Sequence, residues 1–426
     1  MTTLLPSSMD YSQTHASLPE NMTATQITLS PANGSTFSAG SVVQFDYLNR
    51  GFIVPDSIFI RYKMSIGTLQ NAGTQAQMIG TPVYTPFVRN ETLVGSSIIE
   101  SANQWNQICN VTTNLSTSVS SKYGLMAAYG YLDGSATSIP TMSQMDGRNW
   151  IANETATFSG MVPGILSNCE KLIPAFAMGQ IRSQFTIDSV ANMFVQLATT
   201  FAPTAITISN FELVYTMLDA GPAVENIVRS LGTFYIKSQS IANSSVTLAS
   251  GTSGSVSLVY NQRLASVKSA FVLFTGTTVN SLNKWGDAYD PTTNNGEVSI
   301  NVGGISYPQR PLSTLNNKAG ILQYLRNTTG SIYDRNNELS INAVEWNRVG
   351  NEITTVTEPA KFYLGFNLEK LHTNALLTGI STQNSAITVL VSTSTATAQA
   401  HTVNLLLSYD ALIEVDTASR MVTVKQ

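Results

Sequence analysis

Charge is what this 426-residue sequence has least of: Asp, Glu, Lys and Arg make up 11% of it, and the net charge is −4. A typical soluble protein has about 25% charged residues. The hydrophobic content is an ordinary 43%, which argues against disorder, since disordered chains combine high charge with few apolar residues. So few charges give little self-repulsion between copies. The composition therefore indicates either a secreted or adhesive β protein or a protein that packs densely against itself.

Cysteine is scarce too. Cys109 and Cys169 are too few for a disulfide framework, and we expect free buried thiols, although an oxidising compartment would allow the two to pair. The N-terminus lacks the cationic start and apolar core of a signal peptide. Eight Asn-x-Ser/Thr sequons carry sugar only if the chain enters the secretory route: Asn21, Asn33, Asn90, Asn110, Asn114, Asn153, Asn243 and Asn327. We expect synthesis in the cytosol.

Basic residues are missing from the start of the chain, where no Lys or Arg precedes Arg50. A basic arm that neutralises phosphates is therefore excluded, and we expect no sequence-specific nucleic-acid partner. No apolar run approaches the roughly 20 residues of a membrane span. We expect a soluble chain that does not cross a membrane.

Motifs of known catalytic chemistry are missing as well. The three histidines, His15, His372 and His401, are too scattered for a metal site, and His372 is expected in a surface turn. The sequence contains no zinc-protease, nucleophile-elbow, phosphate-loop or dinucleotide-binding pattern. We predict no catalytic, cofactor-binding or metal-binding residue, and no enzyme.

Two groups of charged residues are candidate sites. Asp287, Asp290 and Glu297 in WGDAYDPTTNNGE offer oxygen ligands for calcium, but their spacing fits no calcium loop and favours a solvated loop. Arg263 and Lys268 stand at the start of an apolar strand, where ion pairing or edge protection explains them more simply than a ligand.

An internal repeat is the most informative feature that is present. Residues 193–218 align without gaps with residues 387–412 at an offset of 194. The identities are Val195/Val389, Thr199/Thr393, Ala202/Ala396, Asn210/Asn404, Leu213/Leu407, Tyr215/Tyr409 and Leu218/Leu412. A period this long is typical of a duplicated domain and not of a solenoid. Convergence between two Ser/Thr/Ala-rich strands is the alternative; superposed halves should place Asn210 on Asn404 if the repeat is real.

Strand patterns dominate the chain. Short alternating runs separated by Gly and Pro begin near Thr25 and predict a sandwich or barrel. The pair Gly303–Gly304 predicts a bulge or turn. Strict alternation near the C-terminus predicts a strand with one core row: Val403, Leu405, Leu407, Tyr409, Ala411, Ile413 and Val415. The fold class is therefore all-β.

Helix signals are few and fall in the middle of each half. Ile98, Ala102, Trp105 and Cys109 recur at spacings of 4, 3 and 4, which predicts one face of a short helix. Ile321, Leu322 and Leu325 form a weaker counterpart. Two unrelated surface helices remain an alternative to equivalent ones.

The segment LDAGPAVENIVRSLG lies between the halves. Pro222 can open a single helical turn and Gly232 can end the segment. We predict an extended arm over 1–22, a first domain over 23–219, a linker over 220–232 and a second domain over 233–426.

Five further segments are informative in their order and spacing: NFELVYTMLDAGPAVENIV, RLASVKSAFVLF, INVGGISYPQRPL, FYLGFNLEK with LLTGIST, and YDALIEVDTASRMVTVKQ. Together they resemble segments of double jelly-roll major capsid proteins of DNA viruses, of the type found in polinton-like viruses and virophages. The resemblance is strongest across 205–426, and its weight lies in the order and spacing of the segments.

The resemblance implies two tandem eight-stranded antiparallel jelly rolls, side by side, with short helices in loops. It further implies a pseudo-hexameric homotrimer that tiles an icosahedral virion shell. Implied partners are the chain itself, a penton protein and minor capsid proteins, while the resemblance leaves open whether an internal membrane lies beneath the shell. No cofactor is implied.

A carbohydrate-binding or adhesive β-sandwich, viral fibre or lectin-like, is the alternative function. In that case Trp150, Trp285 and Trp346 would stack on sugar faces if exposed. A hydrolase on the same scaffold would need paired carboxylates, which the sequence does not place.

Overall fold

The computed structural model describes residues 22–70, 76–131, 147–194, 202–276, 288, 290–292, 295–315, 317–329, 339–341, 346–347, 360–370, 378–397 and 400–426. All structural statements below concern these residues. The predicted N-terminal arm lies outside them, except for Met22.

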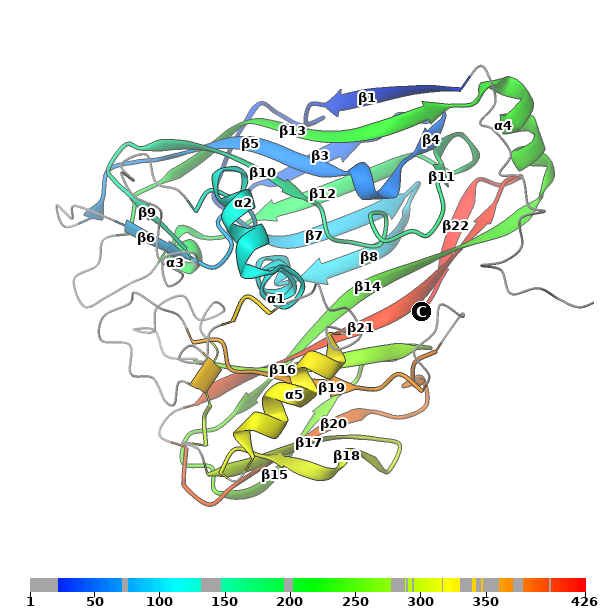
Figure 1. Ribbon diagram of the computed structural model, residues 1–426. Helices are drawn as coiled ribbons and strands as arrows, with labels where there is room; N and C mark the ends of the chain where they lie inside the picture. Colours follow the sequence, from blue (N-terminus) through cyan, green and yellow to red (C-terminus); the bar gives the residue numbers. More distant parts are fainter. Residues whose placement is uncertain are drawn as a thin grey trace, which may run out of the picture.

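The first half of the chain is a sandwich of two antiparallel sheets (Figure 1). One sheet runs β1 (Thr23–Leu29), β13 (Ile206–Asp219), β5 (Phe59–Ile66), β10 (Thr155–Met161), and also includes β2 (Thr36–Ser38), β4 (Phe52–Ile53) and β11 (Ile173–Pro174). The other runs β3 (Val42–Asp46), β12 (Ile181–Ile187), β7 (Phe87–Val94), β8 (Ser97–Asn103).

The second half repeats this arrangement. One sheet runs β14 (Thr233–Leu248), β21 (His401–Asp416), β16 (Val267–Gly276), β19 (Tyr363–Asn367), with β22 (Met421–Lys425) also paired to β21. The other runs β15 (Gly254–Tyr260), β20 (Ile387–Thr393), β17 (Gly296–Val302), β18 (Ile305–Ser313).

The strand order is the same in both halves. In each sandwich the first, eighth, third and sixth principal strands make one sheet, and the second, seventh, fourth and fifth make the other. This order is that of an eight-stranded jelly roll, in which two four-stranded sheets bury one face each. The predicted all-β fold with two jelly rolls is therefore confirmed.

The repeat is visible at residue level in the closing strands β13 and β21. Leu213, Leu407, Tyr215 and Tyr409 are all buried, as predicted for the core face. The whole predicted core row of β21 is buried too. The upstream part of the first copy, residues 195–201, lies outside the described residues.

The two repeat asparagines have different environments. Asn210 is exposed and adopts a φ of 48° where the pairing of β13 with β5 shifts register. Asn404 is buried in a regular ladder, and its Nδ2 donates to Thr275 Oγ1 at 3.1 Å. A bulge in only one copy breaks the alternation there, so this match in sequence is not a match in surroundings.

The helix predictions were half right. α1 spans Trp105–Ser116 and contains Trp105 and Cys109, but Ile98 and Ala102 belong to strand β8, so the helix begins later than predicted. α5 (Lys318–Thr328) confirms the second helix, with Ile321 and Leu325 buried. Both helices follow equivalent hairpins, β7–β8 and β17–β18.

The remaining short elements lie mainly in the first half. α2 (Val119–Tyr129) follows α1, and β6 (Ala76–Ile79) pairs with β9 (Gly147–Trp150). The other short elements are η2 (Pro55–Ser57), η5 (Ala175–Ala177) and α3 (Val190–Met193). In the second half, Gly303 and Gly304 have φ of 60° and 85° and form the turn between β17 and β18, as predicted.

Helix α4 (Gly221–Ser230) occupies the predicted linker at one end of the molecule (Figure 1). It has ten residues and thus more than the single turn expected after Pro222. Val224 and Val228 pack against a small cluster that includes Phe176 and Ala220. The exact domain boundaries stay a prediction.

Candidate functional site: the seam between the jelly rolls

The two jelly rolls contact each other along a region that we call the seam. On the first jelly roll it consists of β8, α1 and residues 165–170, and on the second of β14, β22 and Tyr363. Figure 1 shows β8 beside β14, and β22 also contacts β8. The seam fixes how the two sandwiches stand side by side.

A buried carboxylate lies at the centre of the seam. Glu100 on β8 is 7% exposed, and both of its oxygens lie about 3 Å from the backbone N–H of Ile165, at 3.0 and 2.9 Å. The hydroxyl of Ser240 on β14 also donates to it. Burial raises the pKa of Glu100, and the hydrogen bonds from Ser240 and Ile165 oppose that rise.

Further polar contacts continue the seam around Lys237. Lys237 Nζ lies 3.0 Å from Glu170 Oε1, and Glu170 N donates to Lys237 O at 3.0 Å. Asn168 Nδ2 donates to Gln239 O, also at 3.0 Å. Backbone carbonyl groups on this edge of β14 thus accept hydrogen bonds from the first jelly roll, where another strand would otherwise pair.

Asn114 on α1 joins the halves at the other end of the seam. Its side chain is fully buried; Nδ2 donates to the Tyr363 hydroxyl at 3.3 Å, and Oδ1 accepts from Lys122 Nζ at 2.6 Å. Its carbonyl accepts from Ser340 N and Oγ, both at 3.2 Å. One asparagine therefore connects α1, α2 and two segments of the second half.

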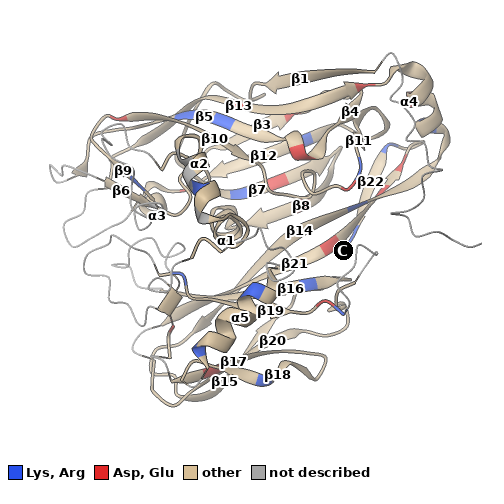
Figure 2. Ribbon diagram, viewed as in Figure 1, with Lys and Arg blue, Asp and Glu red and all other residues tan. Residues whose placement is uncertain are grey.

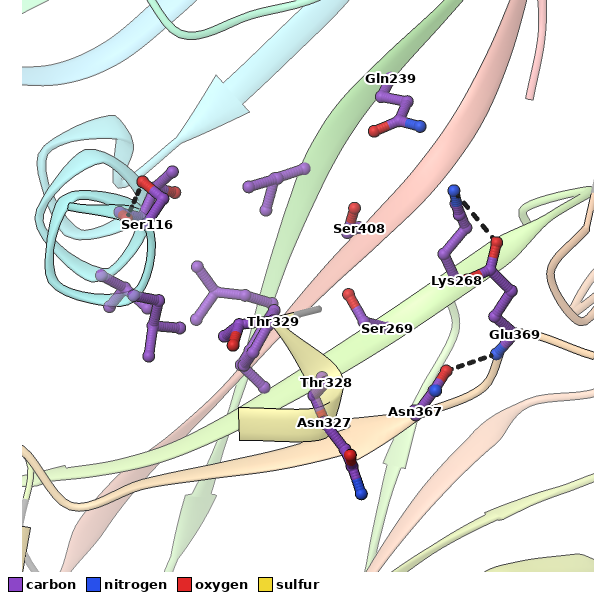
Figure 3. A pocket seen from close by; sticks show the side chains of 16 residues that line it. Ser116, Gln239, Lys268, Ser269, Asn327, Thr328, Thr329, Asn367, Glu369 and Ser408 are labelled. Carbon is purple, nitrogen blue, oxygen red and sulfur yellow. Dashed lines mark hydrogen bonds and ion pairs between the residues drawn. The ribbon is translucent and has the colours of Figure 1, made fainter. Parts of the chain in front are cut away.

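A pocket of about 360 Å³ opens at the seam (Figure 3). Its walls come from α1, β14, β16, β19, β21 and the end of α5, so both jelly rolls contribute. An ion pair between Lys268 and Glu369, with Nζ and Oε1 3.1 Å apart, lies on its polar side. Lys268 thus ion-pairs, as predicted, and Arg263 Nη1 donates to Gln383 O at 2.6 Å.

The described part of the acidic loop differs from the predicted solvated loop, because Asp290 is buried. Asp290 is buried and accepts from Thr292 N at 2.9 Å and from Thr292 Oγ1 at 2.6 Å, whereas Glu297 is exposed on β17. Asp287 lies outside the described residues. No group of three His, Cys, Asp or Glu side chains gathers for a metal within the described ranges.

The other candidate residues are also placed. His401 is buried, while His15 and His372 lie outside the described residues. Cys109 is a free buried thiol, as expected, and Cys169 is free but only partly buried. Several sequons are buried, namely Asn90, Asn110 and Asn114, whereas Asn33 and Asn153 are exposed. The side chains of the three buried asparagines are part of the protein interior.

The outer surface carries few charges. Figure 2 shows isolated blue and red segments on both jelly rolls. Large exposed apolar side chains lie between them, including Ile227 and Leu231 at α4, Met421 on β22 and Ile305 at the β17–β18 turn, each 58–63% exposed. No helix in the described part of the chain combines the length and the apolar character that crossing a membrane requires.

The seam and its pocket were missed by reasoning from sequence. Their members are common Ser, Asn, Gln and Glu residues, separated by up to 249 positions in the case of Asn114 and Tyr363. No motif links them. Polar residues that interrupt apolar strands, such as Glu100 in β8, were the only local signal.

Known protein structures share this architecture. No family model matches the chain, and neither does any curated protein sequence. A structure of the PBCV-1 virus capsid matches with a TM-score of 0.62 at 12% identity, covering 98% of this chain and 99% of that one. The Faustovirus major capsid protein matches with a TM-score of 0.62 at 9% identity, covering 96% and 92%. The mavirus major capsid protein matches with a TM-score of 0.53 at 9% identity, covering 99% and 93%. Over nearly its whole length, the chain has the fold of these double jelly-roll viral major capsid proteins.

Proposed function

We propose that this chain is a viral major capsid protein whose function is to assemble with copies of itself. The observation that carries this proposal is the same jelly-roll order twice in one chain, with near-complete overlap on capsid proteins. Two sandwiches side by side per chain let three chains build a ring of six. We infer a pseudo-hexameric homotrimer that tiles an icosahedral shell in the virion.

The surface chemistry supports self-association. With 11% charged residues, little desolvation of charge opposes contact between copies. Burial of exposed apolar side chains such as Ile227 and Leu231 would contribute favourable free energy to association. A closed ring buries the same patches on every copy. In this proposal the chain is made in the host cytosol, and a penton protein and minor capsid proteins complete the shell.

Sugar binding has less support. Trp150 and Trp346 are buried, at 0% and 5% exposure, and Trp346 Nε1 donates to Tyr363 O at 3.3 Å. Neither offers a free ring face for a sugar. Trp285 lies outside the described residues.

Mass in solution tests the proposal. Light scattering of the purified full-length chain should give about three times 45.8 kDa, and negative-stain images should show hexagonal particles or closed shells. A stable monomer that binds glycans on an array would overturn the proposal.

A further inference from the structure

The seam pocket has two chemically different walls. The apolar wall consists of Val111 and Leu115 on α1, Ile241 on β14, Phe271 on β16 and Leu406 on β21. All but Ile241 are at least nine-tenths buried. At about 360 Å³, the space is at the lower end of the range for small-molecule pockets.

Two hydroxyl groups on the sheet floor have no hydrogen-bond partner among the described residues. Ser269 on β16 is 8% exposed, and its hydroxyl makes no hydrogen bond with the described part of the chain. The same holds for the hydroxyl of Ser408 on β21. Figure 3 shows both side chains at the centre of the pocket. Ser408 is partly buried, and both hydroxyls are available to a molecule that enters the pocket.

The helix hydroxyls around the pocket differ from these two. Ser116 Oγ donates to Thr112 O at 2.7 Å, Thr328 Oγ1 to Tyr324 O at 2.8 Å, and Thr329 Oγ1 to Arg326 O at 2.9 Å. They are satisfied by their own helices. Among the hydroxyls named here, only those of Ser269 and Ser408 are left to bind a ligand, and the side-chain amides of Gln239 and Asn327 also line the pocket.

Charge in the pocket is already balanced. Lys268 pairs with Glu369, whose carboxylate also accepts from Thr378 Oγ1 at 2.5 Å. An anionic head group would approach Glu369, and a cationic one would approach Lys268. An uncharged head group meets neither repulsion.

We propose that the seam pocket binds an uncharged amphipathic small molecule. Its hydrocarbon body lies against Leu115, Phe271 and Leu406, and its hydroxyl or carbonyl head hydrogen-bonds to Ser269 and Ser408. Because α1 comes from one jelly roll and the sheet floor from the other, the bound molecule stabilises the seam. The proposal does not depend on the capsid function.

Three probes with the same ten-carbon chain test it: 1-decanol, decanoate and decylammonium. Saturation-transfer NMR on the purified full-length protein should show saturable binding of decanol, and decanol should raise the melting midpoint with concentration. Decanoate and decylammonium should bind at least tenfold more weakly. Absence of saturable decanol binding, or tighter binding of either charged probe, would overturn the proposal.

Variants locate the binding. Ser408→Phe fills the pocket and should abolish decanol binding, whereas Ser245→Phe, on an exposed site of β14 outside the pocket, should leave it unchanged. Ser269→Ala removes one hydroxyl and should weaken binding about fivefold. This smaller change keeps the proposal testable if Ser408→Phe does not fold. Unchanged affinity in Ser269→Ala would contradict the assigned head-group contact.

Discussion

The hydroxyl of Ser240 on β14 donates a hydrogen bond to the carboxylate of Glu100 on β8, 140 residues earlier in the chain. Tyr409 lies close enough for the Glu100 charge to raise its pKa as well, after burial, to about 12. Because Glu100 is buried in this contact, we expect the stability of the seam to depend on pH.

The pH dependence of stability should change in Glu100→Gln. Burial raises the pKa of Glu100 above its ordinary 4.5, so the folded protein keeps this proton to higher pH than the unfolded chain does. The contribution of Glu100 to the unfolding free energy is therefore full below about 4.5 and falls as pH rises through the folded-state pKa. The urea midpoint of the variant minus that of the wild type should therefore increase as the pH is raised from 4 to 7. Glu297→Gln, at an exposed site, is the matched control; parallel curves for Glu100→Gln and wild type would refute the assignment.

Removing the Asn114 side chain should destabilise the seam. Asn114→Ala leaves the Lys122 ammonium and the Tyr363 hydroxyl each with one partner fewer in a buried site. We expect a loss of about 3 kcal/mol in unfolding free energy. Asn114→Asp should lose less, because it offers Lys122 an acceptor. Asn226→Ala on the exposed face of α4 should change stability by less than about 0.5 kcal/mol; a similar loss there would remove the argument.

Two glycines should respond to alanine in opposite ways. A Cβ on Gly379 would lie 2.4 Å from Val267 O and 2.5 Å from its carbonyl carbon, so Gly379→Ala should cost about 2 kcal/mol or more. Gly124 in α2 has open space around it, so Gly124→Ala should stabilise the helix by about 1 kcal/mol. Thermal melts of the two variants check the signs; equal effects would contradict these packing distances.

Both thiols should be unreactive in the folded protein. Burial raises the pKa of Cys109 well above its usual value and that of Cys169 to about 12, and Cys169 Sγ also donates to Ile165 O at 3.2 Å. Since the thiolate is the reactive form, a disulfide reagent at pH 8 should label neither until denaturant is added. Labelling of the native protein, or a melting midpoint that falls with reductant, would show that this environment is wrong.

Local patterns predicted the strands best. The alternation from Val403 to Val415 is a property of neighbouring residues, and all seven core positions of β21 are buried. The predicted helix at Ile98 was wrong, because this segment pairs as a strand with an irregular register: Ile98 is 58% exposed whereas Ala102 is buried. Pairing with β7 decides for the strand, and this pairing involves residues up to 14 positions away.

Contacts between the halves were beyond such patterns. Glu100 and Asn114 gain their roles from partners that are distant in sequence, and each is an ordinary polar residue in its own segment. The repeat at offset 194 did lead to the right architecture. It gave no information on which polar residues face the other jelly roll, because the copies differ there.

The equal strand order of the two jelly rolls coexists with unequal edges. The edge strand beside β21 is one continuous run, β14, whereas the corresponding edge beside β13 is divided between β1 and β2. In a ring of three such chains, the six jelly rolls would have the same strand order, but they would be of two kinds with different edge strands. Neighbouring positions around the ring would then present different edges to a docking molecule. The ring would have true threefold symmetry, although its outline would have six similar positions.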